Sequence, residues 1–593
     1  MHNRKFQPML PWDNDTLLLS ALDASEQPTF CYTVRELTML AWINELTDMP
    51  DWQCKIFDPD IAFRWKSEKV LVGQDVTRSM ADWCIDEVRY YVADFNHTRI
   101  IPAIDGGVIK SDDCIGASLI SDLTKIVSAL RRSPTRRASS QGHIVDLVDP
   151  HLFPLAFGKT RTLRGPPYIS PKECISRAGE GEVVRMPREE ETKQEERGKY
   201  PNDMAWSRRF QWLPFEVIWE DRGHGAARIA SYINDVHPIT HSSLYRVIES
   251  LIDSLIPLFN RTLIDLKAPG YQNQRIHLAD ITRNPVVDRD PGHFRPPEQR
   301  AYRKWVNNQG QYDNSIFVDL KREFWNVGLQ MVLQMRDINL SVDDPEYEGE
   351  DWHVQGQNNE RIVATATYVY SISNIATTSS PKLSFRRRVH PEESVLARDS
   401  ADWKSPPFLS DIYGAQDGSP SIQHLGDVTL REGRVVTFPN VFQTRLAPFT
   451  LQDKAKPGHL RLLMLHLIDP NRRAMSTSMV PCQRRDWWAH EIRTSCRWLW
   501  RLPKVVFNMI VEQVEDWPIP MEQGEKMRSE FLQERDGFRE RHTRAMEGYQ
   551  QWDFGEDKGD SDEEDEENDD DWDLCKTPIS EMEGFSANGA YAN

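Results

Sequence analysis

The feature that most constrains this chain is a region of strand-like segments across residues 328–471. Residues 329–335 partly alternate apolar and polar side chains, and 362–372 are rich in Val, Thr and Tyr, which favour extended backbone. Residues 433–438 lead into a Pro-Asn turn signal, and 460–468 end at an Asp-Pro pair. Several short strands separated by turns are typical of a β-barrel or a β-sandwich.

Helical patterns dominate the start of the chain. Residues 33–45 carry apolar side chains at helical spacings behind a capping box that begins at Thr33. Residues 81–94 and 117–131 show further helical patterns. The opening region is therefore expected to be mainly helical.

The fold class expected from these patterns is α+β. A long helix is expected over 242–256, with one apolar face and with Pro257 ending or kinking it. The expected organisation is a mainly helical N-terminal region 1–150, an α/β middle region 151–327, a strand-rich domain 328–471, C-terminal helices 472–550 and an acidic tail 551–593.

The negative charge of the chain is concentrated near its C-terminus. The formal net charge is −19, but residues 556–573 alone hold thirteen acidic residues and one lysine. The rest of the chain is only mildly acidic and shows no basic footprint for nucleic acid. A run of like charges this dense repels itself, so we expect a disordered, solubilising tail, with contact to a basic partner as the alternative.

Neither secretion nor a membrane span is expected. Residues 1–10 lack the apolar core of a secretory signal, and runs such as 462–468 are far shorter than the roughly 20 apolar residues that a span needs. The eight cysteines form no CxxC pair, which argues against a zinc cluster and favours reduced thiols. We therefore expect a cytoplasmic protein, with nuclear residence left open, and neither nucleic acid nor membrane among its partners.

Two histidine-containing segments are candidates for chemistry. His237 and His241 lie four residues apart, but Pro238 intervenes and the helix begins later, so we interpret both as structural histidines. His353 and Gln355 lie two residues apart at the end of a strand, where side chains at this spacing point to the same face. The sequence contains no GxSxG elbow, Walker A loop or GxGxxG motif.

A set of short segments carries a resemblance to a known family. These segments are RELTML (35–40), SYINDVHP (231–238), IPLFN (256–260), YEGEDWH (347–353), NERIVAT (359–365), GRVVTFPN (433–440), KPGH (456–459) and DWW (486–488). They resemble a large fungal family of uncharacterised proteins, a domain of unknown function whose C-terminal half is similar to Fe(II)/2-oxoglutarate-dependent oxygenases. The resemblance implies a C-terminal double-stranded β-helix (a jelly-roll, cupin-like fold) with Fe(II) and 2-oxoglutarate as cofactors.

The resemblance carries over unevenly to the metal site of such oxygenases. It implies two histidines and one carboxylate around the iron, and an arginine for the carboxylate of 2-oxoglutarate. The proximal histidine falls on His353, but the carboxylate position falls on Gln355 and the distal histidine on Thr444. The arginine position falls on Leu460, and the adjacent Arg461 is one step along a strand, which turns its side chain to the other face. Neutral Gln and Thr ligands predict a metal affinity lower by several orders of magnitude.

Two functions are therefore compatible with the sequence. The first is a dioxygenase that works through His353 and substitute ligands, for which Glu360, His466, His424 and His459 are the candidates. The second is a non-enzymatic binding or scaffold protein that uses the oxygenase fold, with an unknown small molecule or protein as its partner. The first predicts binding of metal and 2-oxoglutarate, and the second predicts neither.

Overall fold

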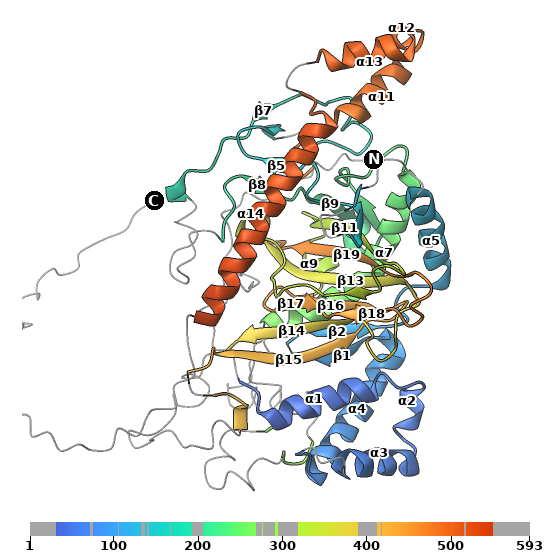
Figure 1. Cartoon of the computed structure of the whole chain (residues 1–593), viewed down its shortest axis with the longest axis vertical. Coiled ribbons are helices and arrows are strands. Elements are labelled where there is room, and N and C mark those ends of the chain that lie inside the picture. Colours follow the sequence, from blue (N-terminus) through green and yellow to red (C-terminus); the bar gives the residue numbers. More distant parts are fainter. Residues whose placement is uncertain are drawn as a thin grey trace, which may run out of the picture.

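The computed structural model describes residues 31–71, 75–104, 106–131, 137–138, 142–165, 168–191, 205–267, 275–276, 291–294, 318–389, 412–416, 418–514 and 517–548. These residues form a mixed helix and strand structure around a large antiparallel sheet (Figure 1). The expected acidic tail lies outside the described residues. Among the helices described, none has both the length and the apolar character that crossing a bilayer requires.

Four strands of the large sheet come from the strand-rich region, and they overlap the four segments predicted to be extended. They are β11 (Leu329–Leu340), β13 (Ile362–Ser373), β16 (Val435–Pro439) and β19 (Gly458–Ile468). Their order in the sheet is β16-β13-β19-β11, so the last strand along the chain, β19, lies between the first two, β11 and β13.

Strands from earlier in the chain extend both edges of this sheet. The strands β1 (Ile101–Ile104) and β2 (Val108–Ser111) continue it beyond β16, and β4 (Ile144–Val148) and β3 (Arg137–Ala138) continue it beyond β11. The start of β11 also pairs with β9 (Phe215–Trp219), which pairs with β10 (Ala227–Ile229). The regions expected before residue 328 therefore contribute strands to the same sheet as 328–471.

The other strands of 328–471 form smaller sheets. One has the order β15-β14-β17, from β14 (Lys382–Arg388), β15 (Ile422–Thr429) and β17 (Gln443–Leu446). Another pairs β12 (Glu346–Tyr347) with β18 (Phe449–Thr450). Two further short pairs join β5 (Leu155–Ala156) to β8 (Phe210–Gln211) and β6 (Arg161–Thr162) to β7 (Glu182–Val183).

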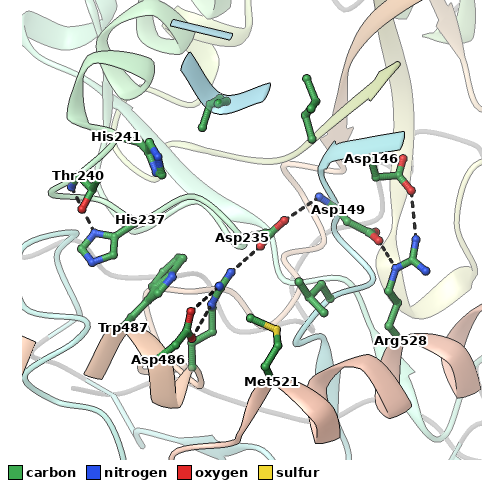
Figure 2. Close-up of a pocket in the computed structure, with 14 residues that line it drawn as sticks. Asp146, Asp149, Asp235, His237, Thr240, His241, Asp486, Trp487, Met521 and Arg528 are labelled. Atoms are coloured by element: carbon green, nitrogen blue, oxygen red, sulfur yellow. Dashed lines mark hydrogen bonds and ion pairs between the residues drawn. The ribbon is translucent and has the colours of Figure 1, made fainter. Parts of the chain in front are cut away.

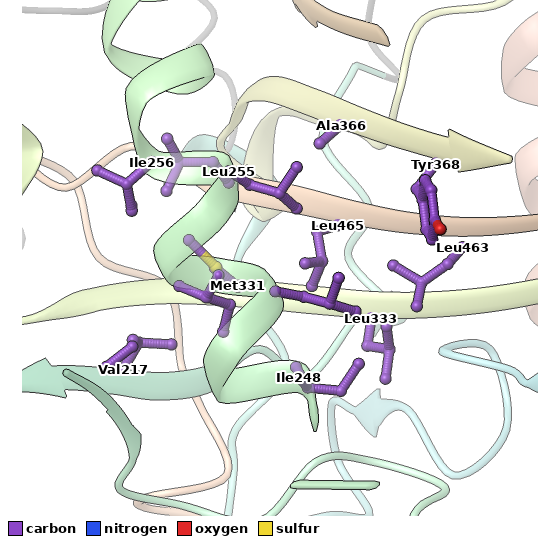
Figure 3. Close-up of a cluster of buried hydrophobic side chains, with 14 of the residues drawn as sticks. Val217, Ile248, Leu255, Ile256, Met331, Leu333, Ala366, Tyr368, Leu463 and Leu465 are labelled. Atoms are coloured by element: carbon purple, nitrogen blue, oxygen red, sulfur yellow. The ribbon is translucent and has the colours of Figure 1, made fainter. Parts of the chain in front are cut away.

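One face of the large sheet is covered by α7 (Ser242–Lys267) and α5 (Ala117–Arg131). Alternate side chains of the strands, such as Leu333 and Leu465, point to this face and pack against Leu255 of α7 (Figure 3). Because strand side chains alternate between faces, this packing fixes which residues point the other way.

The opposite face of the large sheet packs against the smaller sheets. Buried side chains from both layers form one cluster, which includes Ile338 and Leu462 from the large sheet and Phe385 and Leu446 from the small one. Toward the start of β11 the same face carries polar side chains, and His466 in the middle of this group is fully buried. The candidate site lies at this polar end.

Helices lie near the two ends of the described part of the chain. The N-terminal ones are α1 (Val34–Leu46), α2 (Trp52–Lys55), α3 (Pro59–Leu71) and α4 (Arg78–Thr98), and the capping box at Thr33 is present. The C-terminal ones are α11 (Arg485–Ser495), α12 (Arg497–Trp500), α13 (Lys504–Glu512) and α14 (Met521–Gly548). Short elements complete the set, namely η2 (Asp221–Gly223), α9 (Leu320–Glu323) and η5 (Asn358–Glu360). The helix predicted to end or kink at Pro257 continues through it to Lys267.

Candidate functional site

Three of the four site residues predicted from the sequence meet at the end of the small sheet. His353 and Thr444 form an isolated antiparallel bridge, in which each backbone N–H donates to the other carbonyl at 3.0 and 2.8 Å. The backbone N–H of Gln355 donates to Oδ1 of Asn440 at 2.9 Å, which anchors the strand end beside them. The His-x-Gln spacing and the distant Thr444 are thus brought together as the sequence predicts.

Both ring nitrogens of His353 have hydrogen-bond partners. Nδ1 lies 2.9 Å from the backbone carbonyl of Asp351, which can only accept, so Nδ1 carries the proton. Nε2 lies 3.1 Å from the amide nitrogen of Gln355, which donates to its lone pair. Burial, assisted by the charge of Arg539 and opposed by Glu350, lowers the pKa of His353 to about 4. The lone pair that a metal would need is therefore engaged in a neutral ring.

Glu350, the carboxylate whose charge acts on His353, is held in an ion pair. Glu350 lies 2.9 Å from Arg336 of β11, and its backbone N–H donates to Leu446. Burial tends to raise the pKa of Glu350, but its electrostatic interactions with His353, Arg336 and Arg539 outweigh burial, so the pKa is lowered. Glu350 is thus an anion neutralised by arginine.

Arg461, the fourth site residue predicted from the sequence, does not lie beside His353. Leu460 is fully buried on the face toward the small sheet, and Arg461 turns to the opposite face. There its guanidinium is 3.8 Å from Asp337, which also pairs with Arg131 of α5. The structure therefore places Arg461 outside the group around His353, as the one-residue step along the strand requires.

The substitute ligands considered from the sequence do not converge on His353. Glu360 is in an ion pair with Arg535, and His459 hydrogen-bonds Ser371 at 2.9 Å. His424 packs against Trp352, with ring centroids 5.4 Å apart. Across the described ranges, no group of three His, Cys, Asp or Glu side chains is arranged to hold a metal ion.

His466 does point to the inner face, but it is enclosed by protein. Its Nδ1 lies 3.0 Å from the hydroxyl of Thr365, and its ring lies 5.1 Å from that of Trp212. Burial, together with the charge of Arg535, lowers its pKa to about 3. The folded protein therefore holds a neutral ring at pH values where an unfolded chain, with a pKa of about 6.5, takes up a proton.

Acid should therefore destabilise the protein through His466. Between about pH 6.5 and 3 the unfolded state binds more protons than the folded one, so the stability that the neutral ring contributes above pH 6.5 is lost as the pH falls. We expect the free energy of unfolding of His466→Gln to fall less steeply than that of the wild type below pH 6, by about 1.4 kcal/mol per pH unit. Urea unfolding at a series of pH values measures this. The exposed His97→Gln should run parallel to the wild type, and a parallel His466→Gln profile would contradict the assignment.

Helix α14 covers the end of the two sheets where His353 lies. It runs past the strand ends on one side of both layers (Figure 1). The hydroxyl of Thr543 donates to the backbone carbonyl of Trp352 at 3.2 Å, and Phe538 packs against Val354. The guanidinium of Arg535 binds both oxygens of Glu360 at 2.6 and 2.7 Å. The helix closes the site with buried side chains.

A chain of ion pairs leads from Glu350 to a pocket outside the sheets. Arg336, which holds Glu350, also lies 3.3 Å from Asp146 of β4. Asp146 is 3.2 Å from Arg528 of α14, and Arg528 also pairs with Asp149. The candidate site and the pocket are thus parts of one charged network.

The pocket has a volume of about 210 Å³ and is lined by polar and apolar side chains in similar measure (Figure 2). Its charged side chains form two groups, in which Arg484 holds Asp235 and Asp486, and Arg528 holds Asp146 and Asp149. The remaining lining residues are Leu130, Leu147, Leu152, His237, Thr240, His241, Trp487 and Met521. The lining holds four aspartates and two arginines, and Arg336 from outside the lining also pairs with Asp146, so the aspartates still outnumber the arginines that hold them.

The ring N–H of His237 at Nε2 has no hydrogen-bond partner in the described part of the chain. Its Nδ1 accepts from the backbone N–H groups of Ile239 and Thr240, both at 3.3 Å, so its Nε2 carries the proton. Burial, together with His241 and other nearby charges, lowers the pKa of His237 to about 4, so the ring is neutral. Nε2 is buried without a described partner in a residue that lines the pocket.

Sequence reasoning interpreted His237 and His241 only as structural histidines. Their positions before the helix are as predicted, since α7 starts at Ser242. The pocket to which they contribute also needs side chains from near residues 146, 235, 484 and 528. No local spacing in the sequence connects those segments, so their proximity could be found only in three dimensions.

The fold and the site define a mixed helix and strand protein with a large antiparallel sheet and a closed, hydrogen-bonded histidine site. The chain belongs to the family described as "Protein of unknown function (DUF4246)", whose model matches residues 78–491. The N-terminal domain of that family, described as "Domain of unknown function DUF4246, N-terminal", matches residues 3–68. No curated protein matches the chain.

Among solved structures, the chain is similar to a selenomethionine-labelled Fe(II)/(alpha)ketoglutarate-dependent dioxygenase, TqaL. The identity is 12%, and the similarity covers 30% of this chain and 57% of the dioxygenase, with a TM-score of 0.16. A likeness at this level carries no argument about function, so the function must be inferred from the residues of the site.

Proposed function

We propose that this protein is a non-catalytic binding protein built on a double-stranded β-helix, in which a closed hydrogen-bonded site replaces an oxygenase iron centre. The proposal joins the strand topology with the chemistry of His353. An oxygenase that works through substitute ligands is the competing function.

The order of the strands supports the double-stranded β-helix. If β17 and β18 are counted as one interrupted strand, eight strands run from β11 to β19. The large sheet takes the sixth, third, eighth and first of them, in that order, and the small sheets take the fifth, fourth, seventh and second. Eight strands divided in this alternating way between two packed layers are the pattern of a jelly roll.

The single observation that carries the function is the hydrogen bonding of His353. A facial iron site needs imidazole lone pairs and a carboxylate directed at one point. Here the lone pair of His353 accepts from Gln355. Thr444, which lies opposite His353 in the backbone bridge, has a neutral side chain. The residues present therefore do not fit Fe(II).

The pocket outside the sheets supports a binding role. At about 210 Å³ it can hold a small organic molecule, since a 150 Å³ engineered cavity holds benzene. The surplus of aspartate over arginine in the lining favours a ligand that brings donors or positive charge of its own. A small, polar, uncharged or cationic molecule meets this condition.

The experiment that tests this function is a turnover assay on the full chain. With Fe(II), ascorbate and 2-oxoglutarate, we expect 2-oxoglutarate to be consumed at the rate of a protein-free control. A consumption rate that saturates with 2-oxoglutarate and falls in His353→Ala would contradict the proposal and establish the oxygenase.

A further inference from the structure

An unusual group of exposed apolar side chains lies on the helical hairpin formed by α12 and α13. Trp498 and Trp500 are 85% and 64% exposed, and Val505 and Met509 are 71% and 60% exposed. Val506 and Ile510 are exposed as well. Single exposed apolar residues are normal on a protein surface, but a contiguous group marks an interaction site.

The hairpin has little support from the body of the protein. Figure 1 shows α12 and α13 beyond the start of α14, away from the sheets. Phe507 is the buried residue of α13, and the guanidinium of Arg493 lies 5.2 Å from its ring centroid. A helix of this length is only marginally stable without a packing surface. A partner that covers the exposed face of α13, opposite Phe507, would therefore stabilise the helix.

Positive charge is interleaved with these apolar residues. Residues 497–512, from the start of α12 to the end of α13, contain three basic residues and one acidic residue. Arg497, Arg501 and Lys504 are exposed, as is the acidic Glu512 at the far end of α13. The chain as a whole is strongly negative, but charges farther away than about 8 Å are largely screened at physiological salt. The hairpin is therefore a local basic and apolar surface on an acidic protein.

We propose that this hairpin docks on an anionic membrane surface, with Trp498, Trp500 and the exposed face of α13 entering the headgroup region. Tryptophan is preferred at that depth because its ring is apolar and its N–H can hydrogen-bond. Arginine and lysine beside it attract anionic lipids, and aliphatic side chains reach the acyl boundary. Surface contact of this kind needs no membrane-spanning helix. The hairpin lies beyond residue 491, where the match to the family ends.

Vesicle co-sedimentation of the full chain tests the proposal. We expect binding to vesicles of phosphatidylcholine with phosphatidylserine, and binding at least about tenfold weaker to phosphatidylcholine alone. Trp498→Ser with Trp500→Ser should weaken binding at least about tenfold. Arg497→Gln with Arg501→Gln and Lys504→Gln should abolish the preference for anionic lipid. The matched control is Phe63→Ser, which removes an isolated apolar side chain that is 69% exposed on α3 and should bind as the wild type does.

Three results would overturn the proposal. They are no binding to either vesicle, equal binding to both, or unchanged binding by the tryptophan variant. Self-association that depends on concentration and is lost in the tryptophan variant, with no vesicle binding, would assign the hairpin to a second copy of the chain. All variants change exposed side chains, so their urea unfolding midpoints should equal that of the wild type and exclude misfolding as the cause.

Discussion

Replacing Asp48 with asparagine is expected to destabilise the protein by about 3–5 kcal/mol, because it leaves buried cations without their shared anion. Asp48, just after α1, lies 2.6 Å from Nζ of Lys110 and 2.8 Å from the guanidinium of Arg434. The side chains of Lys110 and Arg434 are 2% and 0% exposed. Burial lowers the pKa of Lys110 to about 8 even with Asp48 present, so loss of the carboxylate should drive that lysine to its neutral form.

The control for Asp48 lies three residues further along the chain. Asp51 is 76% exposed at its side chain and 3.9 Å from Lys55, so Asp51→Asn should change stability by less than about 0.5 kcal/mol. Urea unfolding of both variants measures the difference. If the two variants unfold at the same urea concentration, the ion pairs of Asp48 with Lys110 and Arg434 do not hold the N-terminal helices against the large sheet.

Replacing Arg535 with leucine is the second change with a large expected effect. The side chains of Arg535 and Glu360 are 2% and 1% exposed, and the guanidinium binds both carboxylate oxygens. Without Arg535, Glu360 would be a buried carboxylate whose partners among the described residues are the backbone N–H groups of Trp212 and Gln357. Breaking a buried pair in this way costs about 3–5 kcal/mol.

The same helix provides the control for Arg535. Arg544 is 74% exposed at its side chain and pairs with Glu540, so Arg544→Leu should leave the unfolding midpoint nearly unchanged. Adding Glu360→Gln to Arg535→Leu should recover part of the loss, because the buried charge is then removed. Equal unfolding curves for Arg535→Leu and Arg544→Leu would show that α14 is not anchored through Glu360.

The sequence predicts the strands and helices well where the periodicity is strong. The strands at 362–372 and 460–468, and the capped helix after Thr33, were placed within a few residues, since alternation and capping are local signals. The helix does not end at Pro257, because tertiary packing of α7 on the large sheet outweighs the local cost of a proline within a helix.

The part of the site that follows from the sequence is the meeting of His353, Gln355 and Thr444. The spacing of two residues places His353 and Gln355 on one face, and the family resemblance assigns Thr444 to the same site. Other features depend on contacts between distant segments. Arg535 of α14 reaches Glu360 across 175 residues, and Arg484 reaches Asp235 across 249. No local sequence pattern indicates such pairings. Neither the position of α14 over His353 nor the pocket could therefore be predicted from the sequence.

We propose that His353 is held in a hydrogen-bonded site that does not bind iron. Calorimetric titration of Mn(II), as a redox-stable substitute for Fe(II), with 2-oxoglutarate present, tests this proposal. We expect no saturable heat for the wild type, and a measurable affinity for Gln355→Glu with Thr444→His, because that pair restores a carboxylate and an imidazole beside His353. Tight, saturable Mn(II) binding by the wild type would contradict it.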